Sequence, residues 1–200
     1  MGLDATAALL QRLLAWGLMP LWLLAGFGDW LCHRAQRIED SAGTRESLLH
    51  WLMLLEMGSA LAAALLLELN AGVLALLLVL CAAHELTTWW DLRFAYPRRR
   101  IPPVEQWFHA LQFSLPWVGF VSLALIHRGQ AAALLGRGEA ADWTFRLKAQ
   151  PLPLEYVWAV AVAGTLLVAL PFAEETLRCR RAAVKAAQRS RLREAVRAAR

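Results

Sequence analysis

The sequence has too few cysteines, in the wrong arrangement, for a disulfide framework or a zinc finger. The three residues, Cys32, Cys81 and Cys179, are odd in number and show no Cys-x-x-Cys spacing. We therefore expect reduced, mostly buried thiols. A small-residue cleavage motif is also missing after the first apolar segment, which runs directly into Asp29 and His33. That absence predicts an uncleaved first membrane span rather than a signal peptide.

The C-terminal stretch, residues 176–200, lacks the features of a nucleic-acid-binding segment. It contains nine basic residues and a single acid, Glu194, without interleaved aromatic residues or a recognisable nucleic-acid module. Such a stretch is typical of an anchor for anionic lipids. We predict two parts, a single transmembrane helical domain over residues 1–175 and a basic cytoplasmic helical tail over 176–200, with membrane lipids as partners and no nucleic acid.

Charge is scarce along most of the chain, and apolar runs take its place. Hydrophobic residues make up 58% of the 200 residues and charged residues 18%, with a mean hydropathy of +0.41. A membrane-spanning helix needs about 20 apolar residues. The pattern predicts an all-α integral membrane protein with five transmembrane helices, over about 9–34, 45–69, 71–96, 104–126 and 154–172. Spans 1–4 are expected to form a four-helix bundle, and Pro20 is expected to kink span 1.

Basic residues are distributed unequally between the two ends of these spans. Three lie in the first loop, four in the third and nine in the tail, against five at the opposite end. By the positive-inside rule, the first set is cytoplasmic and the N-terminus is outside. We expect a cell membrane, with the inner membrane of a bacterium as the favoured location.

Each of the first four spans carries one histidine and one carboxylate at helical spacing. Offsets of four and seven residues place two side chains on one face of a helix, one or two turns apart. All four pairs fall near the cytoplasmic ends of their spans, close to a belt of tryptophans. The eight residues are Asp29, His33, Glu46, His50, His84, Asp91, Glu105 and His109.

Ionisable groups inside a membrane are costly and are usually functional or mutually paired. Imidazole and carboxylate are ligands of iron, manganese and zinc, and dinuclear sites are often built in helix bundles. Eight candidates exceed the needs of one mononuclear zinc site, so we predict that these residues bind two divalent metal ions, iron first, with zinc or manganese as alternatives. The competing interpretation is that they are ordinary helix-face ion pairs or hydrogen bonds between helices.

Several other polar residues have weaker assignments. Glu56 and Glu85 are candidate catalytic residues: Glu56 as a proton donor or simply a protonated, hydrogen-bonded glutamate, and Glu85 as a partner of a metal ligand. Gln112 continues the Glu105/His109 face and can orient a ligand. Cys81 is a possible soft ligand, although a small buried apolar side chain explains it better.

Charges near the helix ends are assigned more ordinary roles. Glu174 and Glu175 are expected to be helix-end charges and Glu39 a solvated loop charge. His127 lies at the far end of span 4 and is expected to be unrelated. Residues 127–152 contain a short alternating pattern that fits either a strand or an interfacial segment.

The preferred function is a membrane-embedded di-iron oxidoreductase or hydroxylase that acts on a hydrophobic small molecule from the cytoplasmic leaflet. The first alternative is a zinc-dependent membrane hydrolase, in which Glu46 or Glu105 acts as the base. The others are a b-type haem protein with two axial histidines and a non-catalytic assembly protein.

Overall fold

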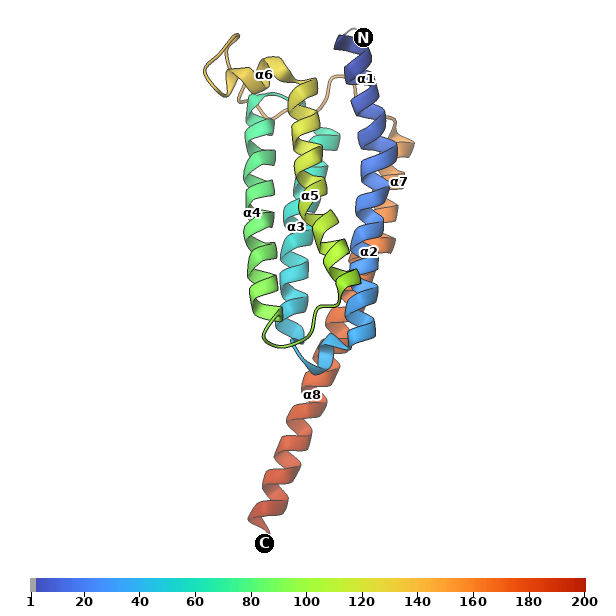
Figure 1. The fold of residues 1–200 in the computed structure, drawn as a ribbon, viewed down its shortest axis with the longest axis vertical. Coiled ribbons are helices and arrows are strands. Elements are labelled where there is room, and N and C mark those ends of the chain that lie inside the picture. Colours follow the sequence, from blue (N-terminus) through green and yellow to red (C-terminus); the bar gives the residue numbers. More distant parts are fainter. Residues whose placement is uncertain (1–2) are drawn as a thin grey trace.

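The computed structural model describes residues 3–200, and side chains from residue 5, as an all-helical protein (Figure 1). Six continuous helices are present in this part of the chain, besides a short 3-10 turn, η2. The first runs through α1 (Leu3–Leu13), η1 (Leu14–Leu18) and α2 (Met19–Gln36); η2 spans Ile38–Asp40. It is followed by α3 (Thr44–Leu66), α4 (Ala71–Ala95), α5 (Pro103–Ile126) and α6 (Arg128–Ala133), and the last joins α7 (Leu154–Gly164), η3 (Thr165–Ala169) and α8 (Leu170–Ala198).

Five of these helices are long and apolar enough to cross a membrane. They cover Ala5–Gln36, Thr44–Leu66, Ala71–Ala95, Pro103–Ile126 and Leu154–Ala198. The loops after α2 and α4 lie at the end of the bundle from which α8 projects (Figure 1). The basic loops and the basic tail therefore share one end of the molecule.

The bundle differs from the expected four-helix arrangement in the position of its last helix. α8 packs against α2 and α3, and η3 packs against α2. Thr176 fixes this contact, because its hydroxyl accepts the indole N–H of Trp51 at 2.9 Å and lies 2.7 Å from the hydroxyl of Ser47. The fifth span is thus part of the bundle, and it continues without a break into the predicted helical tail, which ends at Ala198.

Two prolines are accommodated by wide helical turns. Pro20 and Pro171 each follow a five-residue π-helical segment, η1 and η3, by two positions. Proline lacks an N–H and its ring collides with the carbonyl four residues earlier, and a π turn relieves both problems without ending the helix. At Pro20, where the sequence predicts a kink, the structure has a local π-helical widening of the first helix.

The end of the bundle away from the tail is closed by an apolar cluster and a loop. The cluster lies between α3 and α4 and consists of Met57, Ala60, Ala63, Leu69, Val73, Leu74 and Leu77. The side chain of Asn70 caps α4 by accepting the N–H of Val73 at 3.0 Å. Residues 127–152 are expected to contain a short strand or an interfacial segment. In the described structure, their strand-like pairing is limited to one antiparallel bridge, between Leu67 and Leu147.

Candidate metal centre

The described structure contains three groups of buried histidine and carboxylate side chains that could hold a metal ion. The donor atoms within each group lie within 4.8 Å of one another. The groups share members and form one continuous cluster near the tail end of the bundle. They are Asp29/His33/Glu105/His109, His33/His50/Glu175 and Glu46/His50/Asp91.

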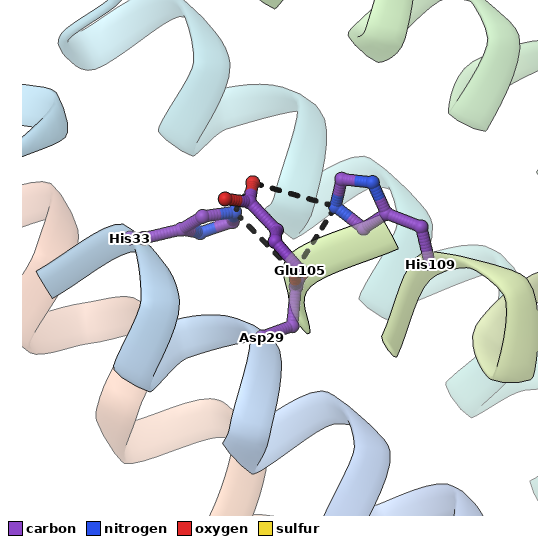
Figure 2. Close-up of side chains that lie close together, drawn as sticks. All are labelled: Asp29, His33, Glu105 and His109. Atoms are coloured by element: carbon purple, nitrogen blue, oxygen red, sulfur yellow. Dashed lines mark ion pairs between the residues drawn. The ribbon is translucent and has the colours of Figure 1, made fainter. Parts of the chain in front are cut away.

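The first group joins α2 to α5 (Figure 2). The Nε2 atom of His33 lies 3.5 Å from Asp29 Oδ1 and 3.3 Å from Glu105 Oε1, and Nε2 of His109 lies 3.0 Å and 3.7 Å from the same two oxygens. Metal–ligand bonds of about 2.0–2.1 Å place neighbouring ligands of a tetrahedral site about 3.3–3.4 Å apart. The four donor atoms therefore have the spacing of a metal site.

Close packing of α2 against α5 makes this approach possible. A Cβ atom added to Gly28 would lie 2.4 Å from the ring of Phe108. Only glycine allows the ring to sit directly on the backbone of α2. Asp29, the next residue, is thereby brought level with His109.

The second group connects the two histidines through a residue of α8. Glu175 is fully buried and accepts hydrogen bonds from Nδ1 of His33 at 3.0 Å and Nδ1 of His50 at 2.7 Å. A carboxylate only accepts, so both rings carry a proton on Nδ1. In its neutral form each ring then has a free lone pair on Nε2, directed away from Glu175. Carboxylates orient metal-binding histidines in this way in many metalloproteins.

The third group extends the cluster to α3 and α4. Nε2 of His50 lies 3.8 Å from Asp91 Oδ2, and Glu46 completes the set. Glu46 Oε2, His50 Nε2 and Asp91 Oδ1 are buried without a hydrogen-bond partner in the described structure. Buried polar atoms are rarely left unpaired. These atoms form another position that could hold a cation.

A buried arginine closes the cluster at its tail end. The guanidinium of Arg99, in the α4–α5 loop, donates to Glu46 Oε1 at 2.6 Å and to Glu105 Oε1 at 2.5 Å, and its side chain is only 4% exposed. Burial alone would lower the pKa of Arg99, but the hydrogen bonds to Glu105 and Glu46 outweigh it and raise this pKa further. The charge of Arg99 is therefore permanent.

The buried cluster has an excess of negative charge. Five buried carboxylates and one guanidinium leave four negative charges if the imidazoles are neutral; the carboxylates are those of Asp29, Glu46, Asp91, Glu105 and Glu175. Bound cations or protons on the imidazoles would offset this excess.

Protonated histidines are the alternative source of positive charge. The rings of His33 and His50, however, are stacked 4.5 Å apart at 13°. Two imidazolium ions in that position would repel each other strongly at low dielectric. The surrounding carboxylates would offset that repulsion, so the stacked geometry is compatible both with neutral rings that bind metal and with protonated rings that pair with the carboxylates.

No protein-family model, curated protein or solved structure matches this chain.

Three candidates from the sequence lie apart from these groups. His84 is buried but joins none of them, and its Nδ1 lies 3.8 Å from Glu56 Oε2. Glu56 accepts a hydrogen bond from the hydroxyl of Thr87 at 2.7 Å. Glu85 accepts the indole N–H of Trp117 at 2.7 Å. The other seven predicted ligands lie in the groups, and their metal-binding role stays a prediction.

Two residues of the buried cluster have positions that the sequence did not predict. Glu175 was assigned to a helix end, and Arg99 was one of several basic loop residues. Glu174, beside Glu175, has the predicted surface role, because it pairs with Arg34 at 2.5 Å. Glu39 is not simply solvated, because it pairs with Arg178.

A long apolar cavity of about 410 Å³ reaches the cluster from the other end of the bundle. Most of its wall comes from α3 and from the helix formed by α7, η3 and α8. Its polar lining consists of Asp29, His50, His84, Gln112 and Thr165.

Proposed function

We propose that this protein is a membrane-embedded oxidoreductase that binds two divalent metal ions, iron first, and acts on a lipid-soluble substrate. The observation that carries the proposal is the shared carboxylate of Glu175. It directs a free Nε2 lone pair of His33 toward one carboxylate group and that of His50 toward another.

The mixed ligand set is compatible with iron, which we propose as the first choice. Imidazole and carboxylate suit iron, manganese and zinc alike, whereas thiol-rich sets favour zinc or iron–sulfur clusters. A pair of iron ions would supply one-electron chemistry when bound. The chain positions the ions, and the apolar cavity beside Asp29 and His50 excludes bulk water and admits a hydrophobic molecule.

The two residues proposed for proton transfer, Glu56 and Glu85, differ in their surroundings. Glu56 is half-buried near His84, and its Oε2 has no hydrogen-bond partner in the described structure, so it is suited to pass a proton toward the cavity end. Neither Glu56 nor Glu85 lines the two cavities at the bundle core, but Glu56 Oε2 lies 3.8 Å from Nδ1 of His84, which lines both. Of the two, Glu56 is the better candidate.

A zinc hydrolase is the second candidate, and one contact argues against it. Glu46 and Glu105 were the candidate bases, and both accept hydrogen bonds from Arg99. A carboxylate paired with a guanidinium through one oxygen is a weaker base at both oxygens, which makes it poorly suited to remove a proton from water. The direct stacking of His33 on His50 likewise leaves no room for a haem between that pair.

For the location, we propose a cell membrane, the bacterial inner membrane first, with the N-terminus outside and the tail in the cytoplasm. The support is the positive-inside distribution of basic residues together with five helices of sufficient length.

Metal analysis and optical spectroscopy of detergent-purified protein test this proposal. We expect two equivalents of iron in the wild type and a clear loss in His50→Ala and His109→Ala. His127→Ala is the matched control, because His127 lies at the opposite end of α5 and should leave the content unchanged. Zinc without any redox change would favour the hydrolase, a Soret band would favour haem, and a protein that binds no metal after reconstitution would refute both metal functions.

A further inference from the structure

The apolar cavity has a shape that suits a single hydrocarbon chain. Along α3 its wall runs from His50 to Leu66, a distance of about 24 Å at 1.5 Å per residue. That length exceeds the roughly 15 Å of acyl chain in one leaflet of a bilayer. The volume of about 410 Å³ is in the range of a site for one small ligand.

Two glycines leave this space open. Gly58 on α3 and Gly164 on α7 both line the cavity, and a Cβ atom added to either would meet no other atom within 4 Å. Several lining residues, such as Ala62 and Ala161, are also exposed on the surface. The cavity is thus open toward the side of the bundle, where the hydrocarbon of a membrane would lie.

The polar end of the cavity holds an imidazole that the metal groups do not use. His84 is 4% exposed, and neither of its ring nitrogens makes a hydrogen bond of good geometry in the described structure; Nδ1 lies 3.8 Å from Glu56 Oε2, and the ring lies near the backbone of Gln112. Gln112 lines the cavity beside it. Pro116, four residues later on α5, has no N–H to donate to the carbonyl of Gln112, so that carbonyl lacks its helical donor. An unpaired imidazole and a free carbonyl together suit a group that both donates and accepts a hydrogen bond.

A neutral hydroxyl meets these requirements better than an acid. Among the residues that line the cavity in the described chain, none is Lys or Arg. Asp29 and Asp91 line a small adjoining pocket with His84, so an anionic head group would face two carboxylates. The chemistry of this end excludes a fatty acid or a phosphate as the preferred ligand.

We propose that the cavity binds one long-chain alcohol, with its hydroxyl between His84 and the carbonyl of Gln112 and its chain directed along α3 toward Leu65 and Leu66. In this position the hydroxyl-bearing carbon lies beside Asp29 and His50. Any reaction of the bound alcohol rests on the proposed oxidoreductase function. Binding itself does not depend on a metal. His84, predicted as a metal ligand from the sequence, is here a residue that binds the lipid.

Photolabelling of the full-length protein in nanodiscs tests this proposal. The probe is hexadecanol with a diazirine at the chain end, and labelled positions are mapped by mass spectrometry. We expect labels near Leu65 and Leu66. Gly164→Phe should abolish them by filling the open space, and Gly58→Phe provides a second filling variant in case the first fails to fold. Ala159→Phe is the control, since Ala159 is exposed on the same helix and does not line the cavity.

The head-group contact has its own measurement. His84→Ala should weaken labelling about tenfold, as the loss of one buried hydrogen bond predicts, and hexadecanoate should compete poorly with the alcohol probe. Labelling that is unchanged in both filling variants would show annular lipid only, and equal competition by the acid would refute the hydroxyl assignment. Labels that vanish when the protein dimerises would show that a second copy covers the cavity.

The same experiment separates this proposal from the metal function. Labelling is repeated on protein treated with a chelator and on protein reconstituted with iron, and the cavity positions should be labelled in both. Retained labelling in a protein that binds no metal would refute the metal function and leave the lipid site standing. Two bound metals without cavity labelling would do the reverse.

Discussion

Replacing Glu175 with glutamine should remove one metal ion and leave the other. Glu175 accepts an Nδ1–H from each of two histidines, His33 and His50. A glutamine has a single carbonyl oxygen, and its amide NH₂ only donates. One ring can keep its bond, whereas the other must turn its lone pair to the amide and carry its proton on Nε2. A protonated Nε2 cannot bind a metal.

The magnitude follows from the role of the shared carboxylate. Loss of a carboxylate partner behind a metal-binding histidine costs about 10- to 100-fold in metal affinity, which is about 1.4–2.8 kcal/mol. In Glu175→Gln, the histidine that keeps its hydrogen bond should lose at most this factor in metal affinity. The other ring should lose binding altogether.

Competition against a chelator of known affinity, followed by metal analysis, measures this effect. At a free metal concentration that saturates the wild type with two equivalents, Glu175→Gln should retain about one. Glu174→Gln is the control, because Glu174 is 39% exposed and pairs with Arg34 at the surface. Wild-type affinity and two equivalents of metal in Glu175→Gln would refute the role of Glu175 as the shared partner of two metal-binding histidines.

Three further substitutions test the surroundings of the cluster, each by thermal unfolding of detergent-purified protein. Arg99→Met should destabilise the metal-free protein by about 3–5 kcal/mol, because it leaves buried carboxylates unpaired, and added metal should restore part of the loss; the exposed Arg98→Met should do neither, and equal effects would contradict a buried role. Gly28→Ala should cost about 1–3 kcal/mol through overpacking against the neighbouring phenylalanine ring, whereas Gly58→Ala, which has open space, should not. Asn70→Ala should cost about 1 kcal/mol through loss of the α4 cap; no change would mean that water replaces the cap.

Helical spacing was a reliable guide where the two side chains of a pair are one turn apart. Asp29 with His33, and Glu105 with His109, each lie on one face and meet across α2 and α5. The local geometry of a helix dictates that result, and the sequence contains it.

The pair at an offset of seven behaved differently for a simple reason. His84 and Asp91 share a face of α4, but seven residues separate them by about 10.5 Å along the axis. In the described structure, Asp91 belongs to one of the candidate ligand groups and His84 to none. Asp91 therefore lies with His50, whereas His84 lies deeper, at the cavity.

The buried positions of Glu175 and Arg99 depend on how the helices pack, which no local sequence pattern encodes. Glu174 and Glu175 are adjacent and chemically alike in the sequence, yet one pairs at the surface and the other is fully buried. The difference is the side of α8 that faces α2 and α3. Arg99 is likewise one of three consecutive arginines, and only the path of the α4–α5 loop selects it.

The π-helical turn η3 determines which side of α8 faces the bundle. Its backbone bond from Leu170 N–H to Thr165 O spans five residues instead of four, so the turn holds one residue more than a regular helix would. Each residue advances a helix by about 100°. Deleting a single residue from Thr165–Ala169 would therefore rotate everything beyond it by that angle and carry Glu175 away from both histidines. The π turn η3 thus sets the rotation of the last helix by one residue, and the geometry of the candidate metal centre depends on that rotation.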